Sequence, residues 1–128
     1  MKSSAFFLLY FSIIFSINSQ RVATNFNNNW QFILEDNPTF SKENFDDSSW
    51  QKLNVPHDWS FEKGVRKGGD QGQGGGYHDG GIGWYRKQFN IKKESLSKIT
   101  YINFDGVYMN SEVWINGHHL GKRPYGYI

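Results

Sequence analysis

The side chains that could carry out acid–base or metal chemistry are few and scattered along this chain of 128 residues. His57 and Asp58 are neighbours, and a carboxylate that orients an imidazole is a common arrangement in general-base catalysis. Because adjacent residues of an extended chain point to opposite faces, we expect instead that Asp58 accepts hydrogen bonds from loop amides while Trp59 packs beneath it. The four histidines, at positions 57, 78, 118 and 119, lack the spacing of metal ligands. The sequence therefore predicts neither a metal site nor a bound cofactor.

A glycine-rich stretch, residues 68–83, contains nine glycines and lies just before an aromatic run that begins at Trp84. Glycine-rich loops bind phosphate when their spacing is G-x-G-x-x-G or G-x-x-x-x-G-K-[ST] and a helix follows. Neither spacing occurs here and no helical pattern follows, which argues against a phosphate site. We expect a long surface loop that is flexible over residues 68–75.

Short apolar runs separated by turn residues predict an all-β fold. The run 111–115 ends at Asn116-Gly117 and resumes over 118–121, which indicates a β-hairpin because both turn residues tolerate positive φ. Further strands are expected over residues 30–34, 50–55, 84–91 and 98–104, where apolar residues alternate with polar ones. Arg86 and Lys87 are expected to be solvated or paired surface charges. Aromatic residues make up 18% of the chain, which suits the core of a β-sandwich.

The amino terminus has the pattern of a secretory signal peptide. A short positive end, Met1-Lys2, precedes an apolar run over residues 5–17 that is too short to span a bilayer comfortably. We expect cleavage after Ser19, which leaves residues 20–128 as one domain, secreted or periplasmic and without a membrane segment; an uncleaved anchor is the alternative. The chain has no cysteine, which excludes a disulfide and a lipoprotein anchor. The net charge of +2 does not indicate nucleic-acid binding.

Three strings of residues follow one another along the chain in the order in which a known protein family has them. They are Val55-Pro56-His57-Asp58-Trp59, then Gly81-Ile82-Gly83-Trp84-Tyr85-Arg86-Lys87, then FDGVYMNSEVWINGHHLG over residues 104–121. Together they resemble the amino-terminal jelly-roll domain of family 2 glycoside hydrolases, and the first two resemble β-galactosidase-like bacterial members most. The resemblance covers residues 26–128. It implies a galactose-binding-like jelly-roll β-sandwich that stops before its last strands, in an amino-terminal fragment of a longer enzyme.

The resemblance also implies roles for two loops. In family 2 glycosidases the loop ahead of the Gly-Trp-Tyr strand can reach the active site of the catalytic barrel and help to bind the terminal sugar, which makes Tyr77, His78 and Asp79 candidate substrate contacts. The turn around Arg123 and Tyr125 is the second such loop. A carboxylate accepts hydrogen bonds from sugar hydroxyls and an imidazole donates or accepts them, so the residue types suit this role.

No catalytic residue is expected in this chain. Retaining glycosidases use two carboxyl groups about 5–5.5 Å apart, and in family 2 both are glutamates of the barrel, the acid–base one following an asparagine. None of the five glutamates here, at positions 35, 43, 62, 94 and 112, follows an asparagine. The resemblance therefore favours a non-catalytic sugar-binding domain of a secreted β-glycosidase, foremost a β-galactosidase, whose partners are a β-galactoside-type glycan and the barrel of the same polypeptide. A free-standing carbohydrate-binding or adhesion module and a truncated product without function are the alternatives.

Overall fold

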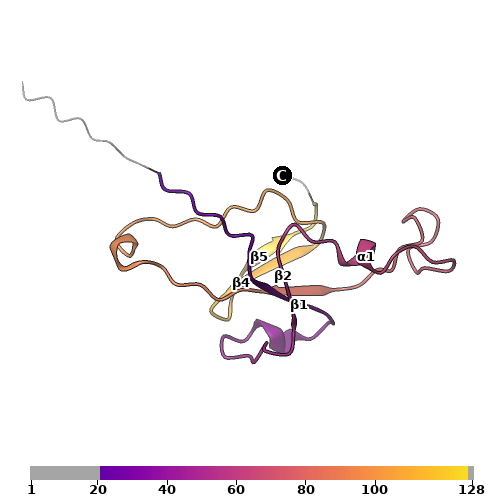
Figure 1. Cartoon of the computed structure of the whole chain (residues 1–128), viewed down its shortest axis with the longest axis horizontal. Coiled ribbons are helices and arrows are strands. Elements are labelled where there is room, and N and C mark those ends of the chain that lie inside the picture. Colours follow the sequence, from indigo (N-terminus) through magenta and orange to yellow (C-terminus); the bar gives the residue numbers. More distant parts are fainter. Residues whose placement is uncertain (1–20, 127–128) are drawn as a thin grey trace, which may run out of the picture.

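Two small antiparallel β-sheets make up most of the regular structure in the computed structural model, which describes residues 21–126. β2 (Gln51–Leu53), β1 (Trp30–Leu34) and β3 (Gly83–Arg86) form one sheet in that order, and β4 (Ser111–Ile115) pairs with β5 (His118–Arg123) in a hairpin (Figure 1). Three single helical turns lie between strands: η1 (Pro38–Ser41), α1 (Trp59–Glu62) and η2 (Lys93–Ser95). The predicted all-β class is confirmed, with two sheets that the described residues leave open at their edges.

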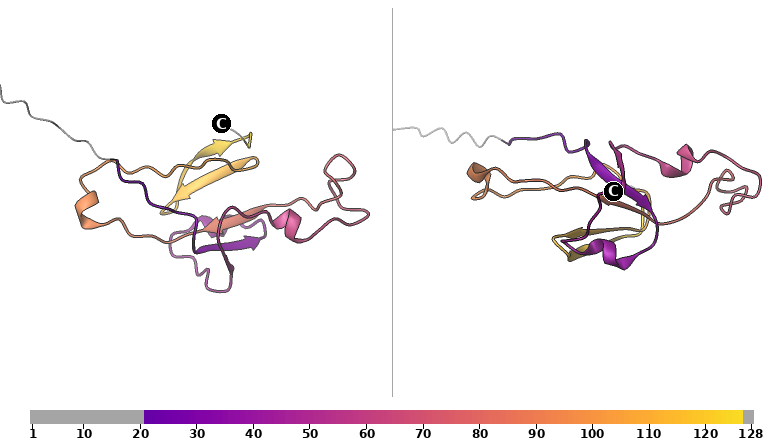
Figure 2. Two further views of the ribbon diagram at one scale, coloured as in Figure 1. Left: turned by 45° about the horizontal axis from the view of Figure 1, so that its top comes forward. Right: turned by 60° about the horizontal axis from the view of Figure 1, so that its bottom comes forward.

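The core lies on both faces of the three-stranded sheet. Phe32 of β1 lies opposite Tyr85 of β3, and the next pair along, Ile33 and Trp84, points to the other face. On that second face the ring of Trp84 stacks on Trp114 of β4, with centroids 4.9 Å apart, and so joins the hairpin to the sheet. Figure 2 shows the hairpin lying alongside the sheet as a separate layer. Phe40 of η1 packs against Trp84 from the same side and is itself only 4% exposed. The hairpin and the sheet thus form the two layers of a β-sandwich.

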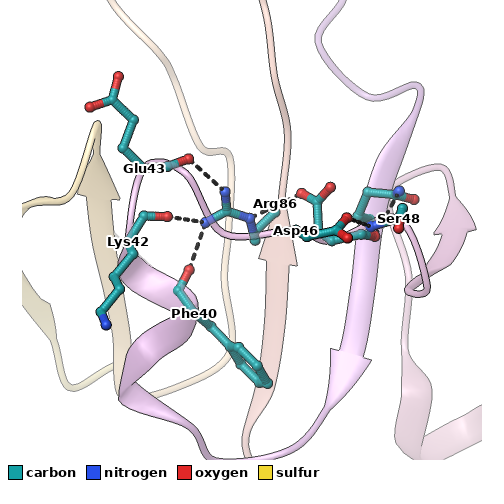
Figure 3. A network of polar contacts seen from close by, with 8 residues as sticks. Phe40, Lys42, Glu43, Asp46, Ser48 and Arg86 are labelled. Atoms are coloured by element: carbon teal, nitrogen blue, oxygen red, sulfur yellow. Dashed lines mark hydrogen bonds and ion pairs between the residues drawn. The ribbon is translucent and has the colours of Figure 1, made fainter.

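Arg86, the last residue of β3, ties the connection between β1 and β2 to the sheet (Figure 3). Its Nη1 donates to the carbonyl oxygens of Phe40 at 2.6 Å and Lys42 at 3.1 Å, and its Nη2 donates to that of Glu43 at 3.3 Å. Its Nε pairs with Asp47 Oδ2 at 3.0 Å, and both of these side chains are 15% exposed. Arg86 is therefore a paired charge, as expected, but one that lies largely inside the fold.

The strand predictions hold where a partner strand is present. β1 has the predicted bounds, β2 and β3 are shorter than predicted, and the hairpin turns at Asn116 and Gly117 with φ of 49° and 78°. The strand predicted over residues 98–104 is wrong: this segment is irregular, and none of the described strands pairs with it. Alternation produces a strand only where a neighbour takes up the backbone hydrogen bonds. Without one, Ile99 and Tyr101 are 81% and 78% exposed.

Two further expectations concern membranes and export. Within residues 21–126, no helix has the length and apolar character needed to cross a membrane. The predicted signal peptide, residues 1–19, lies outside the described residues.

Candidate functional site

The glycine-rich loop and α1 lie at one end of the molecule (Figure 1). Tyr77, His78 and Asp79 lie where this loop returns toward β3. Tyr77 adopts a left-handed conformation, φ 60°, which non-glycine residues seldom adopt, and its amide donates to Gly72 O at 2.8 Å. Tyr77 is 40% exposed. The structure thus places the three predicted residues of this loop together at a tight turn.

Asp79 is held by Arg66, which lies 13 residues earlier in the chain. Arg66 Nε donates to both carboxylate oxygens, at 3.1 and 3.2 Å, and Nη2 donates to Oδ1 at 2.7 Å. These hydrogen bonds lower the pKa of Asp79 and raise that of Arg66. Oδ1 accepts two of these hydrogen bonds and Oδ2 one, and the guanidinium has five N–H donors, so the pair retains unused N–H donors and one unused lone pair on Oδ2. Sequence reasoning missed Arg66 because nothing local in the sequence connects it with Asp79.

His78 is oriented by α1. Its Nδ1 lies 3.1 Å from the carbonyl oxygen of Ser60, and its ring stacks on that of Phe61 with centroids 6.4 Å apart. Because a carbonyl oxygen only accepts, Nδ1 carries the hydrogen and Nε2 of the neutral ring is an acceptor. Phe61, which is 73% exposed, was also missed. A strongly exposed aromatic ring next to the loop would have been its signal, but exposure cannot be read from sequence.

The other two predicted residues lie elsewhere. Arg123 is the last residue of β5 and pairs with Ser111 of β4, while Tyr125 follows two residues later and is 73% exposed. The β4–β5 hairpin lies near the middle of the long axis of the molecule, whereas the glycine-rich loop projects from one end in each view (Figures 1 and 2). The structure therefore does not bring the two predicted groups together.

The adjacent His57 and Asp58 face different partners, as predicted. Asp58 Oδ1 caps α1: it accepts from the amides of Ser60 at 3.0 Å and Phe61 at 3.1 Å, and from the Ser60 hydroxyl at 2.7 Å. The hydroxyl contact is the main cause that lowers the pKa of Asp58. His57 Nδ1 instead lies 2.8 Å from the hydroxyl of Tyr85. The two neighbours do not form a catalytic dyad.

Two hollows on the surface do not coincide with the predicted residues. One of about 510 Å³ is lined by Thr39 and residues 42–46, and one of about 430 Å³ lies between β1, β2 and α1. Among residues 21–126, no three His, Asp or Glu side chains gather closely enough to hold a metal ion.

The chain is similar to known β-glycosidases over most of its length, although no protein-family model matches it. It is 81% identical, over 91% of its residues, to a protein of Formosa agariphila named as a β-glucuronidase. It is 49% identical, over 88% of its residues, to the β-galactosidase BoGH2A of Bacteroides ovatus. The chain spans only 11% and 13% of the lengths of these two relatives.

Two solved structures share the fold. A β-glycosidase from Bacteroides vulgatus aligns with a TM-score of 0.70 and 44% identity, over 81% of this chain and 14% of that one. A glycosyl hydrolase family 2 member from Bacteroides cellulosilyticus aligns with a TM-score of 0.62 and 36% identity, over 80% of this chain and 14% of that one. The chain therefore corresponds to the amino-terminal β-sandwich domain of family 2 glycoside hydrolases.

Proposed function

We propose that this domain is the non-catalytic sugar-binding part of a secreted, retaining β-glycosidase. The observation that carries the proposal is the similarity to β-glycosidases over four fifths or more of the chain. Since the chain spans about a tenth of the length of those relatives, hydrolysis of the O-glycosyl bond is assigned to the whole polypeptide, with both catalytic glutamates on a barrel outside this chain.

We assign the sugar contacts of the domain to the turn that carries Tyr77, His78 and Asp79. Support comes from the unused N–H donors and the unused lone pair of the Arg66–Asp79 pair and from the free Nε2 of His78. Tyr77 itself has an exposed ring, the exposed ring of Phe61 stacks on His78, and flat rings suit the apolar face of a sugar. Arg123 and Tyr125 remain proposed contacts from a second loop.

The sugar is the finer part of the proposal. A β-galactoside is our first candidate, in line with the sequence strings and with the name of the Bacteroides ovatus relative. A β-glucuronide is the second, because the relative at 81% identity carries that name. The two differ chemically: a glucuronide has a carboxylate, which a guanidinium binds through two parallel hydrogen bonds. Arg66 and Arg123 lie at the proposed contacts and would supply the guanidinium that binds the carboxylate of a glucuronide.

The test begins with the gene. An open frame that continues past Ile128 into a barrel with both glutamates is expected, together with turnover of an aryl β-galactoside or an aryl β-glucuronide by the full-length product. A stop codon soon after Ile128 would favour the free-standing carbohydrate-binding module.

The contact itself is tested by Asp79→Asn in the full-length product. Loss of a charged acceptor should raise KM by about tenfold, the lower end expected for a hydrogen bond to a charged group. Asp36→Asn, a substitution of an exposed aspartate after β1, is the matched control and should leave KM unchanged. Equal KM values for both variants would remove Asp79 from the site.

We also propose that residues 1–19 direct export, so that the mature protein is secreted or periplasmic. Amino-terminal sequencing of the protein from the medium or periplasm should begin at Gln20. Protein that is found in the cell and still begins at Met1 would refute this.

A further inference from the structure

His57 contacts three elements of the fold at once. Its side chain is only 4% exposed, and Nδ1 lies 2.8 Å from the hydroxyl of Tyr85 on β3. Nε2 lies 3.2 Å from Oε2 of Glu62, the last residue of α1. The ring also packs at a steep angle against Phe32 of β1, with centroids 4.8 Å apart. One buried imidazole thus joins α1 to the core sheet.

The partners of His57 decide which nitrogen carries the hydrogen. The Glu62 carboxylate only accepts, so Nε2 carries it, although the 3.2 Å contact is not well aligned for a hydrogen bond. Nδ1 of the neutral ring then accepts from the Tyr85 hydroxyl. Burial, followed by the charges of Asp58 and Glu62, raises the pKa of Tyr85 to about 12, so the phenol stays protonated at neutral pH and can donate. Tyr85 thus hydrogen-bonds His57 on one side of the ring, and the other side faces the Glu62 carboxylate through an electrostatic contact.

α1 depends on such contacts because it is a single turn of four residues. A helix of this length is not stable without tertiary support. Asp58 caps its first turn, and Trp59 lies against Gly83 at the start of β3, where an added Cβ would come within 3.3 Å of the indole Nε1. His57 supplies the support at the other end, through Glu62.

α1 in turn holds the loop. The Ser60 carbonyl and the Phe61 ring both contact His78, and Asp79 follows His78 directly in the chain. A change in the position of α1 would therefore move His78 and the residue next to it. Breaking the His57–Glu62 contact would leave α1 held by its cap and by Trp59, with its last residue released.

We propose that His57 is a positioning residue for the sugar-binding loop: through Glu62 it fixes α1, and α1 fixes His78 and Asp79. This deepens the proposed function and rests on it for the identity of the ligand. The positioning itself does not need the ligand, and its test is separate.

The test uses the full-length product and reads hydrogen exchange of the amides within residues 66–80 by mass spectrometry. Glu62→Ala removes the acceptor from the exposed end of the contact, with a residue that favours helix. We expect exchange in this peptide to rise about fivefold, as for the loss of one modest interaction. Glu62→Gln keeps an acceptor and should restore exchange to within about twofold of the parent. Glu94→Ala, at an exposed glutamate of η2, is the control and should leave the loop unchanged.

Tyr85→Phe tests the same contacts of His57 from the core side, since it removes the hydroxyl and keeps the ring. It should raise loop exchange in the same direction, whereas Tyr101→Phe, at a tyrosine that is 78% exposed, should not. Unchanged loop exchange in either Glu62→Ala or Tyr85→Phe would overturn the proposal, as would a failure of Glu62→Gln to restore it.

Kinetics separate this proposal from the proposed function. A rise in KM at constant kcat in Glu62→Ala, together with faster loop exchange, would support both. Faster exchange with unchanged KM would keep the positioning role and refute the sugar contact. Unchanged exchange would refute the positioning role whatever the value of KM.

Discussion

Replacing Arg86 by lysine tests how far the fold depends on one guanidinium. Arg86 donates to three carbonyl oxygens in the connection between β1 and β2 and pairs with Asp47. Lysine keeps the positive charge, but its ammonium is a compact group that cannot present donors as a planar fork. We expect the ammonium to keep the ion pair with Asp47 and to lose at least two of the carbonyl contacts.

The magnitude follows from those contacts. A hydrogen bond from a charged donor contributes about 1.5–3 kcal/mol, and water recovers part of that where a site is partly exposed. Arg86 and Asp47 are each 15% exposed, so water has limited access. Two lost contacts should then lower the free energy of unfolding by about 2–4 kcal/mol. That is a large share of the 5–15 kcal/mol that is roughly typical of a whole domain.

The assay is urea-induced unfolding followed by tryptophan fluorescence, since Trp50 and Trp84 both contact Phe40 near this network. Arg66→Lys is the matched control, because Arg66 also pairs with a carboxylate but its side chain is 66% exposed. The urea midpoint of Arg66→Lys should therefore stay near that of the parent. If the free energy of unfolding of the parent is smaller than the expected loss, Arg86→Lys should be unfolded in buffer without urea. The same midpoint for Arg86→Lys as for the parent would refute the reasoning.

Three further predictions concern single residues. Gly117→Ala should destabilise the hairpin by about 1 kcal/mol in thermal unfolding, because φ is 78° there, whereas Gly74→Ala, with nothing within 4 Å of the added Cβ and no such φ, should not. Asp58→Ala should cost about 1 kcal/mol through loss of the cap. The pKa of Asp58 is lowered in the folded state, so its contribution to the free energy of unfolding is present above the ordinary pKa of 3.8 and is lost as the pH falls through the lowered value. Urea titrations at decreasing pH should show this loss in the parent and not in Asp58→Ala. The pKa of Tyr85 is raised to about 12, so the stability that its phenol contributes is present below the ordinary pKa of 10 and is lost as the pH rises through about 12. In an ultraviolet titration of the tyrosines, the ionisation step at the highest pH should disappear in Tyr85→Phe.

The parts of the fold that local chemistry dictates could be predicted from the sequence. Asn116-Gly117 specifies a tight turn by itself, and Asp58 caps α1 through amides two and three residues ahead. What sequence reasoning missed depends on contacts between distant residues. Arg66 meets Asp79 across 13 positions and Arg86 meets Asp47 across 39, and neither separation leaves a periodic signal. The alternation over residues 98–104 was a true pattern, but the described residues provide no strand to pair with it.

The open sheets have a consequence for the chain in isolation. The buried apolar core of the described residues consists of Phe32, Phe40 and Trp50. Many large apolar residues are instead at least 60% exposed: Val22, Phe61, Val65, Leu96, Ile99, Tyr101, Tyr108, Leu120 and Tyr125. Exposed apolar surface and unpaired strand edges favour association of chains over solution as a stable monomer.

We therefore predict that residues 20–128, expressed alone, are marginally stable at best. Thermal unfolding by circular dichroism should be broad, and a hydrophobic dye should bind below the transition. The same segment within the full-length product should exchange its amides more slowly, because further chain would cover the exposed apolar residues and give the edges partners. A sharp, cooperative melt of residues 20–128 alone would contradict this, since it would mean that three buried aromatic residues and the Arg86 network stabilise the sandwich without any further partner.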